Sequence, residues 1–198
     1  MTAPPTGAPP SDPGPCAGRY PFELERTWYP AGREQVRIRA LRPEDIDLEL
    51  RFVQGLSRQT LYLRVQYYAT QVAREELERL LDLDYADRLA VAGFVHADEA
   101  ERIVGVSRFA RIAGTARAEC AIVVADDWQG CGLGTELMRS LTQAALARGY
   151  TCLEGVTLAE NVGVSSWARR FGFNVRTEPD SGGLVKVTLE LDPLLPPT

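Results

Sequence analysis

The chain has almost no lysine and almost no histidine, because Lys186 and His96 are the single examples in its 198 residues. A Walker A loop requires a lysine directly after its last glycine, so that nucleotide-binding motif is excluded. The four cysteines show no C-x-x-C spacing, which removes the usual signature of a zinc site or a redox pair. We therefore expect reduced thiols, no metal and a cytoplasmic protein.

Long apolar runs and an excess of positive charge are also absent. No run approaches the roughly 18 apolar residues of a membrane-spanning helix. The first residues have neither the basic start nor the apolar centre of a signal peptide. The formal net charge of −5 argues against a nucleic-acid partner. We expect no membrane and no nucleic acid among the partners, and the sequence leaves the oligomeric state open.

The composition that remains is typical of one globular domain, with 45% hydrophobic and 25% charged residues. Residues 1–18 hold most of a proline and glycine cluster and are predicted to be a disordered tail. The folded domain is predicted over residues 19–192, followed by a short tail at 193–198.

Hydrophobic periodicity predicts a mixed α/β protein. Two segments give no clear pattern: residues 19–32 are expected to pack on the core without regular structure, and residues 55–64 show no single period. The remaining segments alternate between the two kinds of element. Strands are expected near 35–41, 88–96, 103–112, 118–124, 153–158, 174–177 and 184–191, and helices near 42–54, 73–83, 133–149 and 161–173.

A glycine-rich loop lies between a strand and the start of a helix. Gly130, Gly132 and Gly134 allow backbone amides to approach a ligand, and a helix N-terminus adds unpaired amides with a partial positive charge. The segment predicts a pyrophosphate site that needs no lysine. Two alternatives are a tight connection without a ligand and a dinucleotide loop with Glu154 as its acid. The spacing G-x-G-x-G departs from the G-x-G-x-x-G that a dinucleotide requires.

The loop resembles the Gln/Arg-x-x-Gly-x-Gly/Ala segment of the GNAT superfamily of acyl-CoA N-acyltransferases. A second element follows one strand later, where Asn161 precedes a helix that ends at Gly172-Phe173. The resemblance implies a single-domain GNAT fold, with a mixed, mostly antiparallel sheet of about seven strands flanked by about four helices. It also implies acetyl-CoA as co-substrate, bound by Ile122, Val123, Val124, Gln129, Gly130, Cys131, Gly132, Leu133, Gly134, Thr135 and Asn161.

Within that superfamily the chain looks like the acyltransferase domain of bacterial Pat-type protein lysine acetyltransferases. The similarity begins at Tyr20-Pro21, continues through residues 36–45 and 52–57, and includes Tyr62-Leu63-Arg64. It implies that the acceptor is a lysine of a protein, with an acyl-CoA synthetase as one candidate. Many members also have a synthetase-like region; we expect none in this protein, so the resemblance gives no basis for inherited effector control.

An amine attacks a thioester only as the free base, and at pH 7 only about one lysine side chain in a thousand is neutral. A carboxylate near the reacting groups can take the proton. Glu119, at the head of the strand before the loop, is the candidate base, and the Pat-type resemblance assigns that role to this position. We expect desolvation to raise its pKa; the alternative is a strand-end carboxylate facing solvent. Glu154 and Glu160 are weaker candidates.

Other positions refine the hypothesis. Many GNAT enzymes have a tyrosine seven residues after the asparagine, but Ala168 stands there, which agrees with the Pat-type resemblance. Asn161 can cap its helix as well as bind the co-substrate. Covalent catalysis by Cys131 would need His96 as partner, from a different strand. Weak candidates for the acceptor groove are Ser57, Tyr62 and Arg64.

The favoured function is therefore acetyl-CoA-dependent acetylation of a protein lysine by direct attack, with Glu119 as general base. One alternative keeps the fold but acetylates a small amine. Another is a regulatory module that binds CoA without catalysis.

Overall fold

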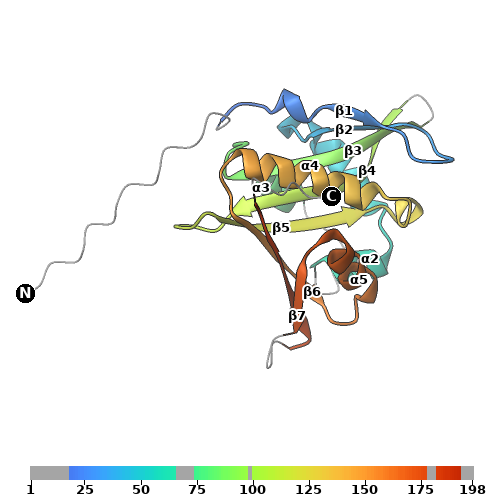
Figure 1. The fold of residues 1–198 in the computed structure, drawn as a ribbon. Coiled ribbons are helices and arrows are strands. Elements are labelled where there is room, and N and C mark those ends of the chain that lie inside the picture. The colour runs from blue at the N-terminus through green and yellow to red at the C-terminus, as the bar shows by residue number, and fades with distance from the viewer. Residues whose placement is uncertain (1–17, 66–73, 98–99, 178–181, 193–198) are drawn as a thin grey trace, which may run out of the picture.

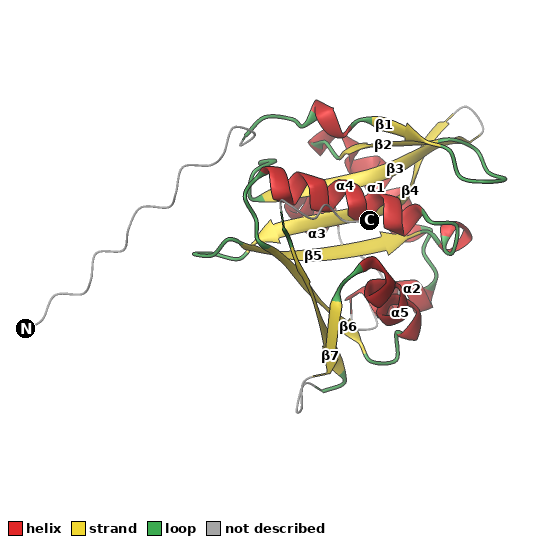
Figure 2. Cartoon of the chain, in the orientation of Figure 1, coloured by secondary structure: helices red, strands yellow, loops and turns green. Residues whose placement is uncertain are grey.

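The computed structural model describes residues 18–65, 74–97, 100–177 and 182–192. They form one mixed sheet of eight strands with helices against both faces (Figures 1 and 2). The predicted tails at 1–18 and 193–198 lie outside the described residues, apart from Gly18, so the domain boundaries stay predictions. In the described part of the chain, no helix is long and apolar enough to cross a membrane.

The strands follow the order β1-β2-β3-β4-β5-β6-β8-β7 across the sheet. Neighbours are antiparallel except for β5 and β6, which run parallel. The strand bounds are β1 (Arg26–Trp28), β2 (Val36–Ala40), β3 (Arg88–Ala97), β4 (Ala100–Arg111), β5 (Arg117–Val124), β6 (Cys152–Leu158), β7 (Asn174–Thr177) and β8 (Leu184–Glu190).

Each face of the sheet has its own set of helices and its own hydrophobic cluster. The longest of the described helices, α4, lies across one face, and α5 lies beside the loop that leads into α4 (Figure 1). The opposite face is covered by the helices of the first half of the chain. The helices are α1 (Ile46–Gln54), α2 (Arg58–Val65), α3 (Arg74–Leu80), α4 (Leu133–Ala147) and α5 (Val162–Phe171), with the 3₁₀ turns η1 (Phe22–Leu24), η2 (Pro43–Asp45) and η3 (Asp126–Trp128).

The predicted α/β class and mostly antiparallel sheet are confirmed, with two elements more than expected. The sequence predicted about seven strands and four helices, and the structure adds β1 and α2. β1 has only three residues, which is too short for an alternating pattern to be recognised in the sequence. It forms by pairing with the edge of β2. α2 has no single apolar face, and its first turn is held by contacts from a distant part of the chain.

Two glycines bring α4 unusually close to the sheet. Gly93 of β3 and Gly105 of β4 face each other in register. A Cβ atom at Gly105 would lie 2.9 Å from Cδ1 of Leu137, and one at Gly93 would lie 3.2 Å from Cδ1 of Leu133. Larger side chains at either position would push the first turns of α4 outward. The sheet therefore fixes where the loop before α4 meets the end of β5.

Candidate active site

The glycine-rich loop enters α4 with a run of unpaired backbone amides. Gly130 and Gly132 have φ angles of +75° and +97°, in the left-handed region that favours glycine. Leu133, the first residue of α4, is fully buried and anchors the helix start. Within the described residues, no acceptor pairs with the amides of these three residues, Cys131 or Gly134. Such a run at a helix start suits an anion of the size of a pyrophosphate.

β5 and β6 pair only over the first residues of each strand and then separate. Their parallel pairing covers three residue pairs and ends where Glu119 aligns with Glu154. Beyond that point β5 pairs only with β4 and β6 only with β8. A Cβ atom at Gly155 would lie 2.7 Å from the carbonyl oxygen of Cys120, so glycine is required at the junction. We call this separation the fork; its open β5 edge carries Ile122, Val123 and Val124.

Glu119 lies at the base of the fork, on the sheet face that α1, α2 and α3 cover. Val123, on the same side of β5, packs into the cluster beneath these helices, whereas Ile122 and Val124 face the start of α4. The Glu119 side chain is exposed, and no hydrogen bond or ion pair joins it to any described residue. The expectation that Glu119 lies in desolvating surroundings is therefore wrong. The strands part at this residue and leave its carboxylate open to solvent.

Glu154, the neighbour of Glu119 across the fork, is engaged by two cations. Arg117 donates from Nη2 to its Oε2 at 2.7 Å, and Nζ of Lys186 lies 3.4 Å from the same oxygen. The hydrogen bond from Arg117, helped by Lys186, lowers the pKa of Glu154 despite partial burial. A carboxylate with a lowered pKa is a weaker proton acceptor. Glu160 lies in the turn before α5 and not where β5 and β6 part, so Glu119 stays the candidate.

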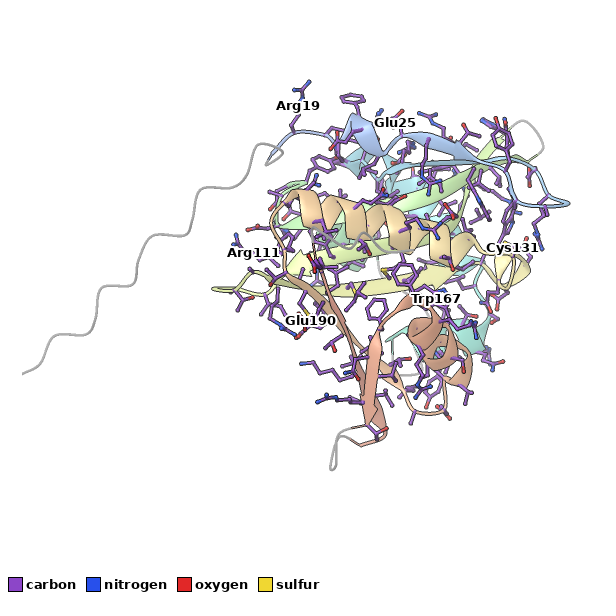
Figure 3. The ribbon with its side chains drawn as sticks, viewed as in Figure 1. Arg19, Glu25, Arg111, Cys131, Trp167 and Glu190 are labelled. Atoms are coloured by element: carbon purple, nitrogen blue, oxygen red, sulfur yellow. The ribbon has the colours of Figure 1, made fainter. Side chains whose placement is uncertain are left out.

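The start of α5 is fixed by a side-chain cap and by a contact to α4. Asn161 accepts the Val164 N–H through Oδ1 at 3.2 Å, which confirms its predicted capping role; its contact with the co-substrate stays a prediction. Trp167, labelled in Figure 3, donates from Nε1 to Oγ1 of Thr135 at 3.1 Å. Ala168, at the position where many GNAT enzymes have a tyrosine, is buried in the core.

Cys131 lies in the glycine-rich loop (Figure 3) and donates from Sγ to the carbonyl oxygen of Trp128 at 3.0 Å. His96 is exposed on β3, next to Glu101 of β4 in register, and no interaction between described residues joins it to Cys131. None of the described cysteines forms a disulfide. Over the same residues, no group of three or more histidine, cysteine, aspartate or glutamate side chains is placed to hold a metal ion.

Two of the three predicted acceptor-groove residues lie in described positions on or beside α2. Ser57 is the cap of this helix, because its hydroxyl accepts the Thr60 N–H at 3.2 Å and donates to Oδ1 of Asp126 at 2.7 Å. Tyr62 is half-buried on the same helix. Arg64 belongs to α2, but its side chain lies outside the described part of the structure. The role of all three in acceptor binding stays a prediction.

Thr60 and Asp126 were missed by the sequence reasoning. Burial alone would raise the pKa of Asp126, but hydrogen bonds from Ser57 and Thr60 lower it below its usual value. The available signal was the S-x-x-T spacing of Ser57 and Thr60, which is typical of a helix start. Their partner is 69 and 66 positions away and carries no local signal.

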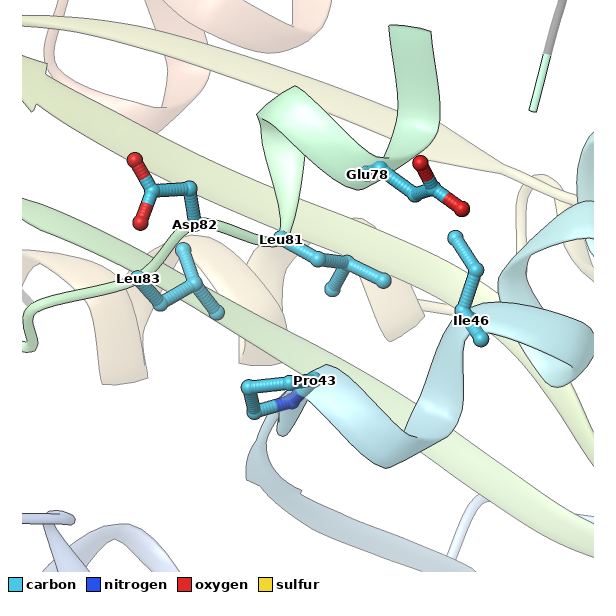
Figure 4. Close-up of a pocket in the computed structure, with 6 residues that line it drawn as sticks. All are labelled: Pro43, Ile46, Glu78, Leu81, Asp82 and Leu83. Atoms are coloured by element: carbon cyan, nitrogen blue, oxygen red, sulfur yellow. The ribbon is translucent and has the colours of Figure 1, made fainter. Parts of the chain in front are cut away.

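A separate hollow of about 410 Å³ lies away from the loop, between the start of α1 and the end of α3 (Figure 4). Apolar side chains and two carboxylates line it. No residue of the loop or the fork contributes to it. Its lining residues are Pro43, Ile46, Glu78, Leu81, Asp82 and Leu83.

Residues 58–173 match the model of the acetyltransferase (GNAT) family. The chain belongs to this family, and it is an N-acetyltransferase with acetyl-CoA as donor.

Two bacterial acetyltransferases resemble the chain in sequence. Acetyltransferase PA5475 of Pseudomonas aeruginosa is 35% identical over 145 residues, which cover 73% of this chain and 78% of that protein. Acetyltransferase Pat of Mycolicibacterium smegmatis is 31% identical over 137 residues, which cover 68% of this chain. The matched segment is 40% of the length of the M. smegmatis protein.

Two solved structures show the same fold. The GNAT domain of S. lividans PAT has a TM-score of 0.79 at 21% identity, with 87% of this chain and all of that chain covered. The PaiA N-acetyltransferase of Thermoplasma acidophilum, solved in complex with coenzyme A, has a TM-score of 0.64 at 18% identity. That match covers 78% of this chain and 98% of the other.

Replacing Gly132 with alanine is expected to weaken acetyl-CoA binding about tenfold. An L-residue in the left-handed region costs roughly 1–2 kcal/mol, and the loop can relieve this strain only by turning its amides. Gly114→Ala is the matched control, because Gly114 has a φ of +73° and nothing within 4 Å of an added Cβ. Calorimetric titration with acetyl-CoA should separate the two variants; equal affinities would contradict the assignment of the loop.

Proposed function

We propose that this enzyme acetylates the side-chain amine of a lysine in a protein substrate, with Glu119 as the general base. The observation that carries the proposal is the fork, which places an unpaired carboxylate beside the open edge of β5. The resemblance to Pat-type protein lysine acetyltransferases supports a protein acceptor, and an acyl-CoA synthetase is one candidate. We further propose that the enzyme acts in the cytoplasm.

One set of residues binds acetyl-CoA, and another residue transfers the proton. In this proposal the amides from Gly130 to Gly134 hold the pyrophosphate, and the backbone of residues 122–124 holds the pantetheine arm and polarises the thioester carbonyl. Asn161 supports the arm from the start of α5. Acetyl-CoA supplies the activated acyl carbon when bound.

Glu119 supplies the base. It removes a proton from the lysine ammonium, directly or through one water, and overcomes an unfavourable ionisation of roughly 4–5 kcal/mol at pH 7. The amine nitrogen then forms the amide bond as the carbon–sulfur bond breaks, and it loses its second proton to solvent. The leaving thiolate belongs to a thiol of pKa near 8.5, so solvent can protonate it without a tyrosine at position 168.

The test is an acceptor screen with isotope-labelled acetyl-CoA. The wild-type enzyme and Glu119→Gln are incubated with a cell lysate, a purified acyl-CoA synthetase and a panel of small amines, and products are read by mass spectrometry. We expect labelled lysines in proteins with the wild-type enzyme only. Turnover confined to small amines would replace the protein acceptor with a metabolite. Binding of CoA without any turnover would make the chain a regulatory module.

A further inference from the structure

The first turn of α2 is fastened to the residues that lead from β5 into the glycine-rich loop. Asp126, the first residue of η3, accepts the Ser57 N–H at 2.9 Å through Oδ2. Its other oxygen accepts the hydroxyl protons of Ser57 and Thr60, each at 2.7 Å. One carboxylate therefore satisfies three donors at the N-terminus of one helix.

Gln129 extends this cluster to the loop itself. Its side-chain amide donates to Oγ1 of Thr60 at 3.3 Å and to the carbonyl oxygen of Val124 at 3.1 Å. Val124 is the last residue of the open β5 edge, and Gln129 directly precedes Gly130. The cluster therefore touches both segments to which acetyl-CoA binding is assigned.

The hydrogen bonds of the cluster can all form at the same time. Each hydroxyl has one proton, and both hydroxyl protons go to Asp126. The oxygen of Ser57 accepts the Thr60 N–H, and the oxygen of Thr60 accepts from Gln129. The negative charge of Asp126 also lies at the positive end of α2. A neutral or differently shaped side chain at position 126 cannot reproduce this set of contacts.

The rest of α2 extends from this attachment toward the fork. Leu61 packs against the cluster beneath α1 and α3, and the helix contacts both β5 and β6. α2 therefore lies over the face of the sheet from which Glu119 is reached. A movement of its first turn would carry the half-buried Tyr62 with it.

We propose that Asp126 is a positioning residue that couples acyl-CoA binding at the loop to the placement of α2 beside the acceptor. The inference rests on the proposed function, because it takes the loop as the co-substrate site and the Glu119 face as the acceptor site. When the loop and Val124 are held by the co-substrate, Gln129 and Asp126 hold the first turn of α2. Such coupling is reciprocal: the factor by which the co-substrate raises the affinity for the acceptor is also the factor by which an acceptor bound against α2 raises the affinity for the co-substrate.

The neighbouring residue provides a matched control. Asp127 carries the same charge in the same 3₁₀ turn, but its side chain is 59% exposed and has one ion pair, with Arg102 at 3.2 Å. Among the described residues, it forms no hydrogen bond or ion pair with α2. Asp126→Ala and Asp127→Ala therefore remove the same charge from adjacent positions, and only the first removes the attachment of α2.

Hydrogen exchange with coenzyme A as the probe tests the coupling without knowledge of the acceptor. In the wild-type protein, we expect coenzyme A to slow exchange of the α2 amides about tenfold. In Asp126→Ala, coenzyme A should still bind with an affinity within about threefold of wild type, but the added protection of α2 should be lost. Asp127→Ala should behave as wild type, and Asp126→Asn, which keeps one acceptor oxygen, should be intermediate.

Several outcomes would overturn the inference. One is equal protection of α2 by coenzyme A in Asp126→Ala and wild type; another is no protection in wild type although calorimetry shows binding. If coenzyme A does not bind wild type at all, the proposed function fails and the inference fails with it. Should Asp126→Ala not fold, Ser57→Ala and Thr60→Val each remove one hydroxyl that donates to Asp126 and accepts from a neighbour, and each must then reduce the protection.

Discussion

Replacing Glu119 with glutamine is expected to lower kcat by about 10²–10⁴-fold at neutral pH and to leave acetyl-CoA affinity unchanged. The amide has the same shape as the carboxylate but cannot accept the ammonium proton. The remaining rate should rise about tenfold per pH unit, because only lysine already deprotonated by solvent reacts. The measurement is the pH profile of thiol release with the acceptor found in the screen, alongside calorimetry with acetyl-CoA.

Two other carboxylates provide comparisons for this result. Glu160→Gln changes an exposed acid in the turn before α5 and should have wild-type kinetics. Glu154→Gln breaks the ion pairs with Arg117 and Lys186, so we expect a moderate effect that does not alter the pH profile. A Glu119→Gln enzyme with kcat within about threefold of wild type would remove this residue from the mechanism.

The second large effect concerns the buried ion pair between Arg39 and Asp45. The guanidinium donates to both carboxylate oxygens, at 2.6 and 2.8 Å, and the Arg42 N–H donates to Oδ2 at 2.8 Å. Arg39 also stacks on the ring of Phe94 at 3.8 Å. Asp45→Ala removes the bidentate partner of this buried cation and leaves it only Glu101, at 3.6 Å, so we expect the free energy of unfolding to fall by about 3 kcal/mol, as measured by urea denaturation.

Asp47 is the matched control for this measurement. It lies two residues further along, is 64% exposed and pairs with Arg74 on the surface, so Asp47→Ala should unfold close to wild type. Replacing both buried partners with apolar residues, Arg39→Met with Asp45→Leu, should recover most of the stability. A loss in Asp45→Ala no larger than in Asp47→Ala would show that the pair contributes little.

The segment from β5 through the loop to α4 was predictable because its signals are local. The apolar β-branched run, the alternating glycines and the leucine spacing all fall within one continuous stretch. The capping role of Asn161 was predictable for the same reason. These features set the fold class and the place of the loop, and they involve no contact between distant segments.

The environment of Glu119 could not be predicted in the same way. Its exposure depends on β5 and β6 parting at Gly155, which is a property of two strands that meet only in the folded sheet. α2 was missed because Asp126, distant in sequence, holds its first turn. The sequence order also hides that β8, and not β7, pairs with β6.

The fork divides the sheet into two blocks. β1 to β5 form one antiparallel block, β6, β8 and β7 form the other, and three residue pairs join them. In the proposed complex, the pantetheine arm lies along the β5 edge and joins the two blocks, and a ligand at a hundred times its Kd stabilises a protein by about 2.7 kcal/mol. By the same proposal, the enzyme unfolds more easily, and is more open to proteases, when acetyl-CoA is scarce.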